Sequence, residues 1–376
     1  MNNQEKKIIF FPNLNGLRFI AALIVLISHV ELIKSAMGLN NKYKLMEHLN
    51  LGGFGVYFFF VLSGFLITYL LLKEKYENKT ISIKDFYVRR ILRIWPLYYL
   101  IVIAGFFILP HIDVIKLNFY SDHFLKLFNE NLILYLLILP NLAFSIFSAV
   151  PHIGQSWSIG VEEQFYLFWP LIIKKFKPTV KFILIVLFSI LLLKILFFII
   201  ATNYSNYNLI VIFKKFIAMS KFESMIIGAF GALILFEKKE KLLLIFLNKK
   251  LFYFSVLCFI PLNYFLFYNV LQNGIHVIIS FMFLVIILNL VYNPKYKTLL
   301  ENKILNYLGS ISYGIYMYHL MVIPFAIAVF KPINENSLLF NLLVYFFSIV
   351  ISILISGLSF KFYESHFLRI KKKYEK

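Results

Sequence analysis

Long apolar stretches alternate with short polar loops along almost the whole chain. Stretches near 20 residues are long enough for an α-helix to cross a hydrocarbon core about 30 Å thick. The pattern therefore predicts an all-α fold, a polytopic membrane helix bundle with about ten transmembrane helices. The predicted spans are 14–33, 53–72, 94–110, 157–173, 180–201, 222–236, 251–268, 275–293, 305–326 and 339–360.

One further apolar stretch, 131–148, does not fit the alternation of loops. If it also crossed the membrane, the lysine-rich segment 174–181 would lie on the outer side. We therefore expect a re-entrant or interfacial segment near 131–148 on the outer face. Other parts of the protein must then cover its backbone polar groups.

Lysine and arginine gather in alternate loops. With the N-terminus inside, the loops predicted to be cytoplasmic hold most of these residues, and loop 73–93 is the richest. The main exceptions are Lys214, Lys215 and Lys221. This asymmetry predicts that both termini are cytoplasmic.

Composition agrees with a membrane protein, because 61% of the 376 residues are hydrophobic and the mean hydropathy is +0.80. Soluble domains are about 45 to 50% apolar.

The net charge of +20 suits anionic lipid headgroups, and we expect no nucleic acid partner because no water-exposed basic domain is present. We expect one integral-membrane domain over 1–376, with its first span retained. The lone Cys258 excludes an internal disulfide.

Two titratable residues lie inside the first span. Arg18 and His29 are eleven positions apart, which places them on nearly the same helical face and about 16 Å from each other. Ionisable groups are costly in lipid unless they face a shared polar interior, so the pair is a candidate functional site. The alternative for His29 is a hydrogen-bonded packing histidine.

Arg90 and Arg93 share a face of the third predicted helix, near the level of Arg18. Three guanidiniums at one level form a multidentate anion site, and phosphate matches their planar geometry. The alternative is contact with lipid headgroups, which we favour for Arg89.

Two later spans carry further titratable residues. Glu162 needs a partner or an altered pKa, and either marks a site. His319 shares a face with Ser312 and Tyr316, so satisfaction by those hydroxyls competes with a chemical role. Helical rise places His29, His319 and Glu162 at a similar depth, about 20 Å from the inner boundary. We expect no metal site, because no span holds a close pair of His or Cys ligands.

Five motifs follow one another along the chain: residues 17–22 (LRFIAA) with His29, 58–65 (FFFVLSGF), 89–96 (RRILRIWP), 157–166 (WSIGVEEQFY) and 312–319 (SYGIYMYH). In this order they resemble the acyltransferase-3 family of bacterial membrane O-acyltransferases. The resemblance covers nearly the whole chain.

The resemblance implies O-acetylation, the transfer of an acyl group, usually acetyl, from cytoplasmic acyl-CoA to an extracytoplasmic carbohydrate hydroxyl. Lipopolysaccharide O-antigen, capsule and exopolysaccharide are such acceptors. It also implies a multi-pass protein of the bacterial plasma (inner) membrane. The hydrolase-like domain that is fused to some family members is not expected here, which favours acceptors other than peptidoglycan.

The resemblance also assigns roles by position. The expected catalytic residues are His29, Glu162 and Arg18, and the expected acyl-CoA-binding residues are Arg18, Arg90 and Arg93. His29 would act as general base on the acceptor hydroxyl, or would first take the acyl group itself, while Glu162 orients it. We expect the substrate to contact Trp157, Tyr316 and His319.

Two other classes of protein remain open from the residues alone. A secondary transporter or glycan-exporting carrier also holds His, Glu and Arg within membrane helices, but it would not bind acyl-CoA. A scaffold for polysaccharide assembly would tolerate replacement of His29.

Overall fold

The computed structural model describes residues 11–40, 51–117, 124–204, 206–268 and 274–375. These residues form helices and no strand, so the predicted all-α fold is confirmed. The N-terminal segment that we place inside, residues 1–10, lies outside the described residues.

Every predicted span falls on a helix. Seven helical stretches within the described residues are long and apolar enough to cross a membrane, and the count of ten remains a prediction. The helices at the predicted spans are α1 (Leu14–Ala36), α3 (Leu51–Asn78), α4 (Ile83–Ile103), α8 (Trp157–Lys175), α9 (Val180–Asn203), α11 (Phe222–Phe236), α13 (Lys249–Tyr268), α14 (Ile275–Tyr292), α16 (Ser312–Phe330) and α17 (Leu338–Ser359).

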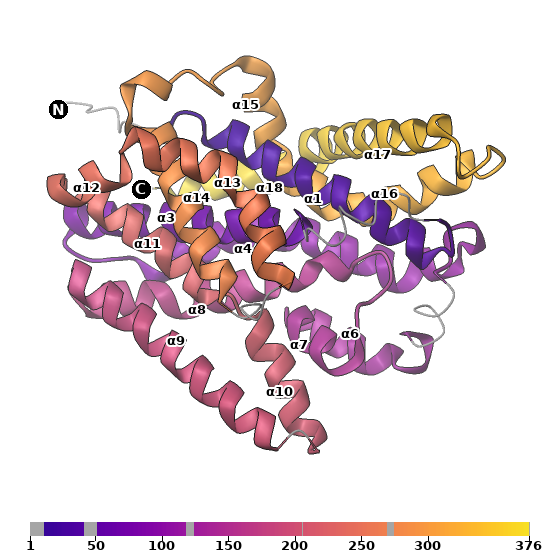
Figure 1. Cartoon of the computed structure of the whole chain (residues 1–376), viewed down its shortest axis with the longest axis horizontal. Helices are drawn as coiled ribbons and strands as arrows, with labels where there is room; N and C mark the ends of the chain where they lie inside the picture. The colour runs from indigo at the N-terminus through magenta and orange to yellow at the C-terminus, as the bar shows by residue number, and fades with distance from the viewer. Residues whose placement is uncertain (1–10, 41–50, 118–123, 205, 269–273, 376) are drawn as a thin grey trace.

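Shorter helices connect these elements. Figure 1 shows α9 and α10 projecting from the bundle, and α16 and α17 packed side by side. The short α-helices are α6 (Phe128–Leu136), α7 (Pro140–Phe147), α10 (Asn208–Met219), α12 (Glu240–Phe246), α15 (Lys303–Ser310) and α18 (Ser365–Lys371). Single turns of 3-10 or π-helix are η1 (Ala104–Ile108), η2 (Leu109–His111), η3 (Asp113–Ile115), η4 (Gly154–Ser156), η5 (Pro294–Tyr296), η6 (Phe360–Glu364) and η7 (Lys372–Tyr374).

Helix α3 is the packing centre of the bundle, because it contacts α1, α8, α11 and α14. Its glycines allow this. The position of Gly64 faces the backbone of Met225 in α11, and that of Gly228 faces the backbone of Val61, so any Cβ would collide in both directions. Reciprocal glycines of this kind let two membrane helices pack backbone to backbone.

Two predicted boundaries are wrong. Most of the predicted loop 73–93 is helical, because α3 continues to Asn78 and α4 begins at Ile83, where Ser82 caps it by accepting a hydrogen bond from the Asp85 amide at 3.4 Å. The predicted span 305–326 is interrupted at Ile311, between α15 and α16. Polar helix ends carry no hydropathy signal, so the apolar pattern misses both features.

The segment near 131–148 is a pair of short helices, as its predicted re-entrant or interfacial character requires. With nine residues in α6 and eight in α7, each is about 12 to 14 Å long, too short to cross. Two tyrosines of α4 donate to backbone carbonyls at the end of α6. Tyr98 donates to the Tyr135 carbonyl at 2.8 Å, and Tyr99 donates to the Leu136 carbonyl at 3.0 Å.

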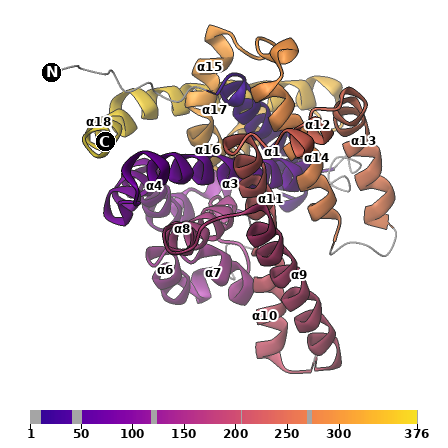
Figure 2. The same ribbon diagram turned by 90° about the vertical axis from the view of Figure 1, so that its left-hand side faces the viewer.

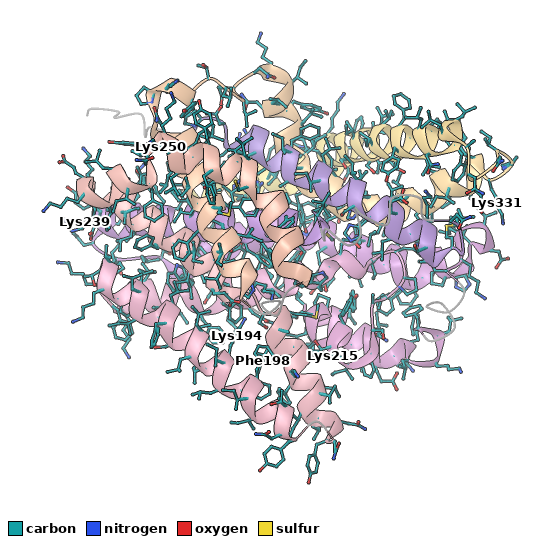
Figure 3. All side chains as sticks on the ribbon, in the orientation of Figure 1. Lys194, Phe198, Lys215, Lys239, Lys250 and Lys331 are labelled. Atoms are coloured by element: carbon teal, nitrogen blue, oxygen red, sulfur yellow. The ribbon has the colours of Figure 1, made fainter. Side chains whose placement is uncertain are left out.

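Lysines mark the two ends of the long axis. Figure 3 shows Lys239 and Lys250 at one end and Lys331 at the other. The first two belong to a loop that we predict inside, and Lys331 belongs to a loop that we predict outside. The structure therefore separates loops that the charge pattern places on opposite sides.

Candidate active site

A cavity of about 130 Å³ lies among α1, α3, α4, α8 and α16. We call it the arginine cavity. Helix packing brings together polar side chains from five separate elements here, in a bundle that is otherwise largely apolar. The polar lining residues are Arg18, Ser63, Arg90, Arg93, Ser158, Glu162, Tyr166, Ser312, Tyr313 and Tyr316.

The three predicted arginines meet in this cavity. In the described part of the chain, Arg89 pairs with Glu74 at 3.1 Å, whereas no carboxylate lies within ion-pair distance of Arg18, Arg90 or Arg93. The Arg90 Nε is buried and has no hydrogen-bond partner among these residues. Buried donors are almost always satisfied, so the cluster is suited to bind an anion.

Glu162 lies in the same cavity and is held by its own helix. The Tyr166 hydroxyl donates to Glu162 at 2.8 Å, and the Ser63 hydroxyl lies 2.5 Å from the Tyr166 oxygen. Because Tyr166 uses its one proton toward the carboxylate, Ser63 must donate to Tyr166. Glu162 also attracts Arg18 and Arg90 electrostatically, which offsets part of the positive charge.

His29 lines a second cavity of about 220 Å³, which we call the histidine cavity. The other residues that line it are Ser28, Leu32, Leu51, Gly52, Gly53, Val56, Gln155, Trp157 and Tyr316. The His29 Nδ1 lies 2.8 Å from the Val25 carbonyl oxygen, which can only accept. Nδ1 therefore carries the proton, and Nε2 keeps its lone pair for proton abstraction or nucleophilic attack.

Gly52 makes room for this histidine. A Cβ at that position would lie 2.6 Å from the Ser28 hydroxyl and 3.4 Å from the His29 Cε1. A larger residue would press on the imidazole. Gly52 thus serves close packing of α3 against α1.

His319 lies beside His29 but lines neither cavity. The two imidazole centroids are 4.9 Å apart. The His319 Nδ1 lies 2.6 Å from the Tyr316 carbonyl oxygen, and its Nε2 is buried without a partner among the described residues. The structure therefore gives His319 a place behind His29 instead of a place in the cavity lining, where a substrate-binding residue is expected.

The two cavities share Val56 and Tyr316, which we call the partition. The Tyr316 hydroxyl donates to the Gln155 carbonyl at 3.0 Å and lies 2.7 Å from the Ser158 hydroxyl, so its ring is fixed. Both partition residues are at most 5% exposed. Trp157 lines the histidine cavity, as expected for a substrate contact.

The structure divides the predicted residues into two groups. Arg18, Arg90, Arg93 and Glu162 share one cavity, while His29 lies across the partition. No contact joins Glu162 to His29 in the described part of the chain, because Tyr166 holds the carboxylate on the arginine side. The similar depth predicted for His29 and His319 agrees with their contact. Depth alone does not determine the direction in which Glu162 points.

Several polar residues of the two cavities are absent from the predicted set, among them Ser63, Ser158, Tyr166 and Gln155. Tyr166 lies one helical turn after Glu162, so the i, i+4 spacing was a usable signal. Gln155 lies in η4, before α8 begins, and its amide donates to the Met317 carbonyl at 2.5 Å. No helical periodicity extends into that turn, so no comparable signal marks Gln155. No group of three or more potential metal ligands gathers anywhere in the described ranges.

The chain is similar to members of one protein family over most of its length. The family model described as "Acyltransferase domain" matches residues 11–358. A Staphylococcus aureus (strain COL) protein provisionally named an O-acetyltransferase is 29% identical over 96% of this chain and 58% of its own length. The peptidoglycan O-acetyltransferase OatA of Listeria monocytogenes is 26% identical over 95% of this chain and 55% of its own.

A second Staphylococcus aureus protein (strain NCTC 8325), the O-acetyltransferase OatA, is 27% identical over 95% of this chain and 57% of its own length. The chain thus spans somewhat more than half the length of the curated relatives it matches. No solved structure matches the chain significantly.

Proposed function

The chain belongs to the acyltransferase-3 family, whose domain model covers residues 11–358, and on this basis we propose that it is a membrane O-acetyltransferase. The donor is acyl-CoA, and the acceptor is a hydroxyl of a carbohydrate on the far side of the plasma membrane. One observation carries the proposal. Three arginines and one histidine lie in adjoining cavities that share the partition, and among the described residues no ion pair engages the arginines and no hydrogen bond engages the His29 Nε2.

The arginine cavity supports the donor assignment. Arg18, Arg90 and Arg93 present planar N–H groups, which match the phosphate oxygens of coenzyme A. A cavity of about 130 Å³ holds a slender acyl arm and not a whole nucleotide. The phosphates therefore lie at the arginines near the mouth, and the thioester reaches toward the partition.

The histidine cavity supports the acceptor assignment. The His29 Nε2 takes the proton of the acceptor hydroxyl, and the hydroxyl oxygen attacks the thioester carbonyl carbon. The new C–O bond forms, the C–S bond breaks, and the coenzyme A thiolate leaves and accepts a proton. Glu162 acts on the arginine side, where it balances the charge that faces the phosphates.

The affinity of the purified protein for acetyl-CoA tests whether acyl-CoA is the donor. We expect Arg93→Gln to weaken binding strongly, because it removes a charge-assisted phosphate contact. Arg369→Gln is the matched control, since Arg369 is an exposed arginine outside the cavity. A wild-type protein without affinity for acetyl-CoA would contradict the proposal and favour a carrier.

Transfer itself is measured as ester-linked acetate released by mild base from cell-surface polysaccharide and, separately, from peptidoglycan. We expect His29→Asn to bind acetyl-CoA like wild type but to lose at least about 100-fold in transfer, the usual contribution of a general base. His111→Asn, which replaces an exposed histidine, should transfer normally. Full transfer by His29→Asn would remove His29 from the chemistry.

A further inference from the structure

The C-terminal segment packs on the helix that carries Arg90 and Arg93. It consists of α18 and η7, and it lies beyond the residues that the family model matches. Figure 2 shows α18 close to α4, and the two helices are in contact. One hydrogen bond fixes the segment itself, because Arg89 donates to the Tyr374 carbonyl at 2.8 Å. A second fixes the preceding turn, η6, where Tyr363 donates to the Pro96 carbonyl at 3.1 Å.

Lys371 brings a further positive charge to the arginines. Its side chain is only 17% exposed, and Arg90 and Arg93 both act on it electrostatically. Its Nζ lies 2.8 Å from a carboxylate oxygen of Glu375, which is about half exposed. Lys371 therefore adds a fourth positive charge to Arg18, Arg90 and Arg93, and the Glu375 carboxylate partly compensates it.

A like-charged cluster of this kind is stabilised when an anion enters it. The nucleotide of acyl-CoA is too large for the arginine cavity, so it must lie at the mouth, along α4. An ammonium group serves as a point-charge contact for phosphate. Lys371 ends α18, which packs on α4, and it lies close enough to Arg90 and Arg93 for their charges to act on it, so it can supply such a contact.

We propose that Lys371 binds a phosphate of the donor nucleotide and that Glu375 forms an ion pair with Lys371 when no donor is bound. This inference rests on the proposed acyl-CoA donor. Lys371 is then part of the donor site. Binding exchanges one anionic partner of Lys371 for another, so Glu375 competes with the donor. Removing the lysine and removing the carboxylate should have opposite effects.

The dissociation constant and the KM for acetyl-CoA test this with purified full-length protein in nanodiscs. We expect Lys371→Gln to raise both about fivefold with little change in kcat, as for a partly screened ion contact. Glu375→Gln should lower both. Lys372→Gln and Lys373→Gln are the matched controls, since both replace exposed lysines of the same segment, and they should match wild type.

The outcomes separate this proposal from the function on which it rests. If the wild-type protein binds no acetyl-CoA, both the proposed donor and the proposed role of Lys371 are overturned. If wild type binds it and Lys371→Gln binds equally well, only the role of Lys371 is overturned. Nanodiscs of phosphatidylcholine alone distinguish the donor from an anionic lipid headgroup, because they contain no anionic lipid. If Lys371→Gln no longer changes the dissociation constant for acetyl-CoA in these nanodiscs, Lys371 contacts lipid and the proposal is overturned.

Discussion

The Tyr316 hydroxyl holds the partition in place. It donates to the Gln155 carbonyl and meets the Ser158 hydroxyl, so α16, η4 and the start of α8 are joined at one atom. The ring of Tyr316 borders both cavities. Its position therefore sets the distance between a donor on one side and His29 on the other.

We expect Tyr316→Phe to keep the ring and lose its anchor. Two hydrogen bonds of about 0.5 to 1.5 kcal/mol each are removed, so the transfer rate should fall about tenfold, while acetyl-CoA affinity stays near wild type. Transfer kinetics and donor binding measure the two quantities.

Tyr318→Phe is the control, because Tyr318 lies on the same helix and its hydroxyl bonds Ser359, away from both cavities. Equal loss of transfer in the two variants would show that the effect is general to α16. It would contradict a specific role for the partition.

For single residues, the sequence predicts which side chains belong to the site better than it predicts which side chains they contact. Arg18, Arg90 and Arg93 converge as their predicted common level requires. Glu162 does not face His29, because a depth estimate treats each helix as straight and says nothing of its rotation or tilt. The hydrogen bond from Tyr166 decides where the carboxylate points, and that bond follows from rotamer and packing.

Among the helices, α3 and α11 form the closest pair. Gly64 and Gly228 each lie against the other helix's backbone, so neither position has a flexible side chain that could yield. This contact fixes α3, which in turn supplies Gly52 next to His29 and Val56 to the partition. The geometry of both cavities thus depends on a contact at some distance from the chemistry.

Gly64→Ala should force α3 and α11 apart. Overpacking of this kind costs about 1 to 3 kcal/mol, which we expect to lower the thermal unfolding midpoint of the protein in detergent. Gly274→Ala is the control, because nothing lies within 4 Å of a Cβ there. An unchanged midpoint for Gly64→Ala would show that the helices yield without cost.

A buried ion network ties α9 to the bundle. The Lys194 Nζ lies 2.8 Å from the Glu223 carboxylate in α11, and His276 of α14 contacts the same carboxylate. Most of α9 is exposed, as a helix that faces lipid would be. The lysine that the hydropathy pattern places inside a span is therefore paired, which is how a buried charge is tolerated.

Elements were predictable where hydropathy is strong. Each of the ten predicted ranges lies mainly on helix, since an apolar stretch of this length has few alternatives in lipid. The helical start of α4 and the interruption at Ile311 were missed, because caps and polar turns decide them. The division of 131–148 into α6 and α7 coincides with Pro140, which begins α7 and is a local signal that the apolar pattern alone does not use.

Over the whole molecule, charge predicts which end faces the cytoplasm. Lys239 and Lys331 lie at opposite ends of the long axis (Figure 3). The excess of positive charge in the loops on one side places Lys239 inside.

Single cysteines test this orientation in intact cells. Cys258 is the only cysteine, so Cys258→Ser provides a cysteine-free background. We expect a membrane-impermeant maleimide to label Lys331→Cys directly and Lys239→Cys only after the cells are permeabilised. The reverse pattern would place the arginine cavity on the outer side and exclude a cytoplasmic donor.

The partition also determines which molecules have to cross the membrane in each reaction cycle. Under the proposed mechanism, neither the coenzyme nor the sugar has to traverse the bilayer, because only a two-carbon fragment changes sides between adjoining chambers. The thiol carrier stays in the compartment where metabolism can recharge it, and the lipid barrier is never opened to molecules of nucleotide size.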